Sequence, residues 1–102
     1  MLYNTTDIKY ISVRPSLPMI TAAQLRASRA ILGIDQRKLA EAAGLSLPTI
    51  QRMEASEGVI RGNVDSLMKL VAALDALGIE LITDNAASPS GGRGVRLKRP
   101  AA

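Results

Sequence analysis

A single glycine between two short amphipathic segments constrains the fold of this chain more than any other feature. Residues 36–43 and 46–55 each place apolar or small side chains at helical spacing, and Gly44 lies between them. Glycine adopts the left-handed backbone that ends a helix at little cost, whereas a residue with a Cβ loses about 1 kcal/mol there. The pattern therefore predicts two short helices joined by a tight turn.

The side chains of these two segments divide into an inner and an outer set. The inner set is apolar or small and should hold the helices together: Leu39, Ala40, Ala43, Leu45, Ile50 and Met53. Ala40 lies where the helices cross, and a larger residue would hold their axes beyond the usual ~8 to 10 Å. The outer set is free to face outward: Gln36, Arg37, Lys38, Gln51 and Arg52. This is the layout of a helix-turn-helix that reads DNA with its second helix.

Capping residues predict four helices in all. A capping box formed by Thr21 and Gln24 opens the first helix, which runs to about Leu32 and ends at Gly33. A proline is tolerated in the first turn of the third helix, at Pro48, because its missing N–H is not needed there. The expected caps of the four helices are Thr21, Asp35, Ser46 and either Asn63 or Asp65.

The apolar period changes from helical to alternating after the fourth helix, which should end at Gly78. That helix carries one apolar face: Leu67, Leu70, Val71, Leu74 and Leu77. Residues 79–83 and 94–99 are predicted strands of a hairpin, joined by a loop over residues 84–92. Two strands alone are marginal in water, so a third should join them, either the candidate strand at residues 7–14 or the hairpin of a second subunit.

The predicted organisation is an N-terminal arm over residues 1–19, a helical domain over residues 20–77, and a C-terminal hairpin with a basic tail over residues 78–102. The 13 basic residues less the four at 93, 96, 98 and 99 leave nine, which balance the nine acidic ones, so these four carry the whole net charge of +4. Two interpretations of the tail stay open. It either contacts phosphates or is a solvated edge strand whose charges discourage aggregation.

Composition narrows the function classes. The chain has no cysteine and no histidine, which excludes disulfides, Cys/His metal sites and Cys or His catalysis. Two tyrosines are its only aromatic residues, which argues against modules that stack single-stranded bases on rings. The glycines near Arg93 lack the flanking strand, helix and Lys-Ser/Thr ending of a phosphate loop. We therefore expect no enzyme, no metal and no cofactor, and the lack of any long apolar run predicts a cytoplasmic protein without a membrane partner.

Residues 21–77 resemble the Cro and lambda-repressor family of helix-turn-helix proteins, also called the XRE family. The matching residues are Arg29, Gln36, Ala40, Gly44, Ile50 and Glu54. The resemblance implies a mainly α fold, a lambda-repressor-like bundle of about four helices, here with a small C-terminal β-hairpin. It also implies a sequence-specific regulator of transcription that binds double-stranded DNA, most simply a repressor that binds palindromic operators as a homodimer.

The resemblance assigns roles residue by residue. Base edges should meet Leu47, Pro48, Gln51 and Arg52, of which only the last two can hydrogen-bond to bases. Phosphate contacts are implied for Gln36, and Ser46, Thr49 and Lys38 are further candidates, although Lys38 can equally be only an exposed helix face. Structural roles fall to Ala40, Gly44, Ile50 and a buried ion pair between Arg29 and Glu54.

A second function class stays open. Antitoxins of toxin-antitoxin pairs use the same scaffold to bind a partner protein and to repress their own operon. The partner would then be a toxin or another effector protein. The short basic C-terminus offers little chain to wrap such a partner.

Overall fold

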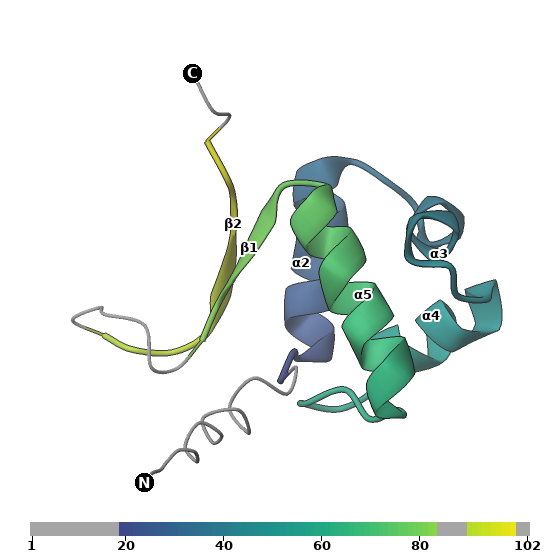
Figure 1. Ribbon diagram of the computed structural model, residues 1–102. Helices are drawn as coiled ribbons and strands as arrows, with labels where there is room; N and C mark the ends of the chain where they lie inside the picture. Colours follow the sequence, from purple (N-terminus) through teal and green to yellow (C-terminus); the bar gives the residue numbers. More distant parts are fainter. Residues whose placement is uncertain (1–18, 84–89, 100–102) are drawn as a thin grey trace, which may run out of the picture.

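The computed structural model describes residues 19–83 and 90–99, which form four helices and one antiparallel hairpin. The elements are α2 (Ala22–Leu32), α3 (Gln36–Ala43), α4 (Leu47–Glu54), α5 (Val64–Ala76), β1 (Ile79–Ile82) and β2 (Gly94–Leu97). Helices α2 and α5 run side by side through the centre, with α3 and α4 on one side of them and the hairpin on the other (Figure 1). This is the mainly α bundle with a small hairpin that the sequence predicts. None of the described helices is long and apolar enough to span a membrane.

Side-chain caps set the helix boundaries, and they confirm the predicted starts. The Thr21 hydroxyl accepts a hydrogen bond from the Gln24 amide at 3.0 Å, and the Gln24 side chain accepts one from the Thr21 amide at 3.0 Å. Asp35 caps α3, Ser46 caps α4, and Asn63, one of two expected starts, caps α5. These bonds satisfy N–H groups that the first turn of a helix leaves without partners.

The core lies between α2, α3, α4 and α5. Its fully buried side chains include Leu25, Leu39, Ile50, Leu70 and Leu74. Ala40 is also buried, which lets α3 approach α4 closely. The prediction that Leu77 belongs to the apolar face of the fourth helix is wrong, because its side chain is 37% exposed. Leu77 is the C-cap of α5 rather than part of its apolar face, because the chain turns away at Gly78 with φ of +101°.

The segment after α4 pairs with the residues at the start of α2. The Ala22 amide donates to the Gly58 carbonyl at 3.0 Å, and the Ile60 amide donates to the Ile20 carbonyl at 2.9 Å. Ile20 and Ile60 are both buried. This pairing brings Ile20 and Ile60 into the core at the start of α2. No local pattern in the sequence predicts it.

The hairpin is held against the helices by one apolar face and one buried amide. β1 and β2 pair with Ile79 opposite Leu97 and Leu81 opposite Val95, and Ile79 is buried. The Gln24 side-chain amide donates to the carbonyls of Ile82 at 3.1 Å and Gly94 at 2.9 Å. Both strands are one or two residues shorter than predicted. In the described residues no third strand joins them, and the candidate strand at residues 7–14 lies outside those residues.

The expected ion pair ties α4 to α2. The Arg29 guanidinium binds both oxygens of the Glu54 carboxylate, with Nε to Oε2 at 2.5 Å and Nη2 to Oε1 at 2.9 Å. The side chain of Glu54 is 5% exposed and that of Arg29 is 23% exposed. Arg29 also donates to the Ile34 carbonyl at 3.1 Å, and Arg26 donates to the Glu54 carbonyl at 2.7 Å. Two arginines of α2 thus hold the last residue of α4.

Substitution of Glu54 should be costly. We expect Glu54→Ala to lower the free energy of unfolding by about 3 kcal/mol, because it leaves the largely buried Arg29 guanidinium without its carboxylate. The measurement is urea denaturation followed by far-UV circular dichroism. Glu41→Ala, which removes an exposed carboxylate of α3, is the control and should change the stability by less than about 0.5 kcal/mol. Equal stability of the two variants would contradict the role of the pair.

The Glu54 carboxyl should also make stability depend on pH. Burial raises its pKa, but hydrogen bonds from Arg29 and Gln36 and the charges of Arg29 and Arg26 outweigh burial and hold the pKa below the ordinary 4.5. The folded state therefore binds fewer protons than the unfolded state, and this stabilisation is lost as the pH falls through the folded pKa. We expect the stability advantage of the wild type over Glu54→Gln to shrink below about pH 4.5. An advantage that grows on acidification would argue against this.

Candidate nucleic-acid interface

Helix α4 has one buried face and one exposed face. Ile50, Met53 and Glu54 are buried, whereas Gln51 and Arg52 are exposed. Its first turn is more mixed. Pro48 is exposed there, while Leu47 and Thr49 are half-buried. The part of α4 that can meet a large ligand therefore runs from Pro48 to Arg52 on the side away from the core.

The turn between α3 and α4 sets this orientation. Gly44 has φ of +68°, and the amide of Leu45 donates to the Ala40 carbonyl at 3.0 Å, which closes the end of α3. A Cβ built on Gly44 would meet nothing within 4 Å. The glycine is therefore required by its backbone angle and not by space. Leu45, half-buried, then packs against the core and directs the chain into α4.

Gln51 and Arg52 are available for ligand binding. Within the described part of the chain, neither side chain forms a hydrogen bond or an ion pair. A guanidinium can donate two parallel hydrogen bonds to guanine O6 and N7, and a glutamine amide can bond to adenine N6 and N7. These side chains can therefore provide hydrogen-bond readout, whereas Leu47 and Pro48 offer only apolar contact.

Gln36 has a partner that the sequence did not predict. Its side-chain amide donates to Oε1 of Glu54 at 3.1 Å, and the residue is half-buried at the start of α3. Gln36 therefore joins α3 to the Arg29–Glu54 pair. An amide nitrogen carries two hydrogens, so one hydrogen remains for a phosphate while the other holds α3 against α4.

Ser46 and Thr49 bond to each other at the start of α4. Their hydroxyl oxygens lie 2.8 Å apart, and the Ser46 oxygen also accepts from the Thr49 amide at 3.2 Å. Since one hydroxyl hydrogen must lie between the two oxygens, only the other is left to donate to a phosphate. Lys38 is exposed, and no acidic side chain pairs with its ammonium group among the described residues.

Arg61 is a candidate that the sequence analysis missed. It is exposed and precedes Gly62, where a Cβ would lie 3.7 Å from the Met53 side chain of α4. The loop before α5 therefore approaches α4 at Gly62, and Arg61 and Asn63 are the exposed residues on either side of that glycine. In the sequence, Arg61 is marked only by its position before Gly62 and the capping residue Asn63. The contact of Gly62 with Met53 is what shows that this loop lies close to α4.

Three of the four basic C-terminal residues bond to other groups of the protein itself. Arg96 pairs with Glu80 at 3.0 Å, Lys98 pairs with Asp75 at 2.6 Å, and Arg93 donates to the Met19 carbonyl at 2.5 Å. The hairpin also lies across the bundle from α3 and α4 (Figure 1). Of the two interpretations left open, this arrangement favours the charged edge strand over a contact with the DNA that α4 would bind.

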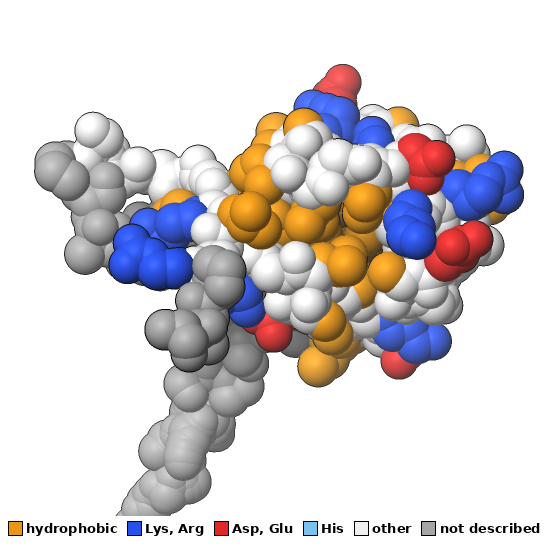
Figure 2. All heavy atoms as spheres, turned by 90° about the horizontal axis from the view of Figure 1, so that it is seen from above, with side chains coloured by type: hydrophobic (Ala, Val, Ile, Leu, Met, Phe, Trp, Pro, Cys, Tyr) orange, Lys and Arg blue, Asp and Glu red, His pale blue; other side chains and the backbone are white. Residues whose placement is uncertain are grey.

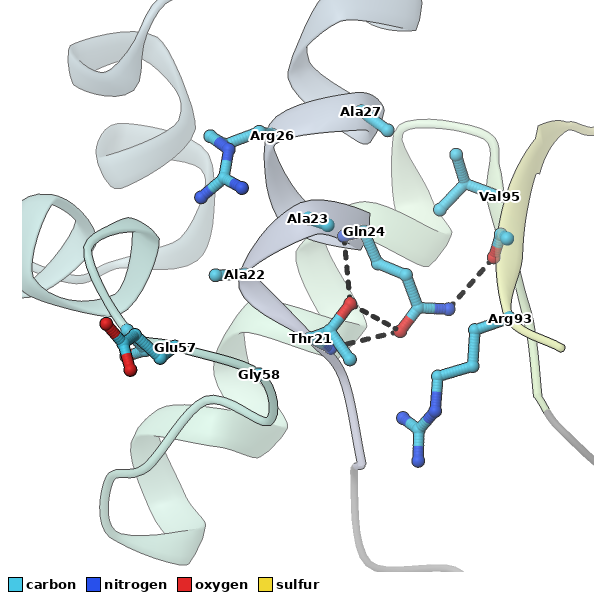
Figure 3. Close-up of a pocket in the computed structure, with 12 residues that line it drawn as sticks. Thr21, Ala22, Ala23, Gln24, Arg26, Ala27, Glu57, Gly58, Arg93 and Val95 are labelled. Carbon is cyan, nitrogen blue, oxygen red and sulfur yellow. Dashed lines mark hydrogen bonds between the residues drawn. The ribbon is translucent and has the colours of Figure 1, made fainter.

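An open hollow of about 620 Å³ lies between the start of α2, the loop after α4 and β2 (Figure 3). Thr21 and Gln24 line it, but their polar groups already bond to each other and to the hairpin carbonyls. Arg26 on the same side is held by the Glu54 carbonyl. The polar groups of Thr21, Gln24 and Arg26 in this hollow are therefore already bonded within the protein, whereas Gln51 and Arg52 on the exposed face of α4 are not.

The chain matches no protein-family model and no curated protein sequence.

Proposed function

We propose that this protein is a sequence-specific regulator of transcription that binds double-stranded DNA in the cytoplasm. The observation that carries the proposal is the outer face of α4, where Gln51 and Arg52 are exposed and have no partner in the described residues. An α-helix fits the major groove of B-DNA, and these two side chains match the donor and acceptor pattern of purines. The function is binding, without catalysis and without a cofactor.

The proposed contacts follow from position. Arg52 and Gln51 bond to base edges, while Leu47 and Pro48 supply shape and contact with a thymine methyl. Around them Gln36, Lys38, Ser46 and Thr49 contact the phosphate backbone, and Arg61 joins them from the loop before α5. The backbone contacts fix the register of α4 in the groove.

Two copies of the protein bind one operator in this proposal. A single recognition helix reads only a few base pairs, and a symmetric dimer reads two half-sites about 34 Å apart on a palindrome. Occupation of such a site within a promoter excludes polymerase, so repression is the simplest outcome of binding.

Loss of Arg52 should affect specificity, and loss of Gln36 should not. We expect Arg52→Ala to cost about 1 to 3 kcal/mol on the best duplex selected from a random pool and to relax the preference at one base pair. Gln36→Ala should weaken binding to all duplexes to a similar extent. Lys69→Ala, which removes one positive charge from α5, is the control and should leave the sequence preference unchanged. Fluorescence anisotropy with labelled duplexes measures all three. Absence of binding to any duplex at low salt would refute the proposal.

Salt dependence should identify the phosphate contacts. Each cation that neutralises a phosphate releases counterions, and each such contact contributes about −0.9 to the slope of log affinity against log salt. We expect Lys38→Gln to make that slope shallower by about 1 and to leave the sequence preference intact. An unchanged slope would show that Lys38 is only an exposed helix face.

A further inference from the structure

The open hollow at the start of α2 borders one edge of the hairpin. Strand β2 lines it through Gly94 and Val95, the loop after α4 lines it through Gly58, and α2 lines it through Ala23 and Ala27 (Figure 3). Its volume is about 620 Å³. Because the two alanines have no side-chain atoms beyond Cβ, another segment of chain can lie close to α2 in this hollow.

The outer edge of β2 has backbone groups without partners in the part of the chain that the structure describes. The Lys98 amide donates to the Gly78 carbonyl at 2.7 Å, which fixes the alternation of the antiparallel ladder. In this register Arg96 bonds to β1, whereas the N–H and C=O groups of Val95 and Leu97 point away from β1. Such an edge is a template for a further strand.

The N-terminal part of the chain joins the described structure beside this edge. The Arg93 guanidinium donates to the Met19 carbonyl at 2.5 Å, and Arg93 directly precedes β2. Residues 1–18 are therefore attached where β2 begins. Residues 15–18 can span up to about 13 Å when extended, so the residues before them can reach the hollow.

We propose that residues 7–14 of the same chain occupy this hollow as a third strand, next to β2 and antiparallel to it. Residues 7–14 run toward Met19, whereas β2 runs away from it, so the two are antiparallel when Arg14 lies beside Gly94. The added strand bonds to the outward groups of β2 and covers the alanines of α2. A third strand also removes the weakness of an isolated two-stranded sheet.

The charges agree with this direction. Asp7 is the only acidic residue among residues 1–18. The antiparallel arrangement places Asp7 toward the end of β2, on the hairpin where Lys and Arg side chains gather (Figure 2). It places Arg14 at the opposite end, where Glu57 lines the hollow.

Amide hydrogen exchange of the full chain tests this inference without DNA, so its outcome does not depend on the proposed function. We expect the Val95 and Leu97 amides to exchange at least about tenfold more slowly than unprotected amides, because they donate to the third strand. Ile8→Asp combined with Ile11→Asp should abolish this protection. Side chains alternate along a strand, so one of these two residues faces α2 whichever way the strand is turned.

Two controls make the exchange measurement specific. Thr5→Asp combined with Thr6→Asp adds the same two charges just before the proposed strand and should leave the protection unchanged. The Arg96 amide, which bonds to β1, should stay protected in every variant and so report an intact hairpin.

Three results of the exchange measurement would overturn the inference. They are Val95 and Leu97 amides that are unprotected in the wild type, protection that the two double variants change equally, and protection that grows with protein concentration. The last result would mean that a second copy of the chain occupies the edge.

The tyrosines provide a second measurement. Tyr3 and Tyr10 are the only aromatic residues of the chain. In a Tyr3→Phe background, the tyrosine band of the near-UV circular dichroism spectrum therefore reports on Tyr10 alone. We expect this band in the folded protein and its loss in the Ile8 and Ile11 double variant, because a ring gives the signal only when packing fixes it. Identical spectra of the two proteins would contradict the proposed strand.

Discussion

The position of α4 depends on the buried carboxylate of Glu54. A helix of eight residues is too short to be stable by itself in water, so tertiary contacts must hold it in place. Apolar contacts of Ile50 and Met53 supply part of the stabilisation of α4, but such contacts are not directional and do not fix its orientation by themselves. The bidentate bond from Arg29 fixes one end of α4 in distance and direction, and Gln36 joins α3 to the same carboxylate. The Arg29–Glu54 ion pair therefore holds both helices of the candidate interface, α4 directly and α3 through Gln36.

The two ends of the molecule serve different purposes. On one side, α4 buries its apolar stripe and leaves polar side chains in solvent. On the other side, the hairpin buries one face on α2 and α5. The buried amide of Gln24 holds the hairpin to α2 by bonding to both strands.

Net charge is a poor guide to where this protein would meet DNA. The excess of four positive charges lies in the hairpin region, yet two of its cations are paired with carboxylates of β1 and α5. Lys38 on α3, Arg52 on α4 and Arg61 in the loop before α5 are exposed, although residues 1–92 as a whole carry no net charge. Local geometry therefore decides which charges can face a phosphate, since exposed ions interact over only about 8 to 10 Å in physiological salt.

The sequence by itself determined the helix boundaries, the turn and the existence of the hairpin. Caps such as Thr21 and Asp35 and the glycine at the α3–α4 turn act within a few residues, so a local pattern contains the whole cause. Tertiary structure alone decided that Gln36 bonds to Glu54, 18 residues away, and that Gln24 bonds to Gly94, 70 residues away. It also decided that Glu80 and Asp75 pair with Arg96 and Lys98, two of the four basic residues at the C-terminal end. Such bonds join groups that are far apart in the sequence, and their distance depends on how the whole chain packs, so no local pattern predicts it.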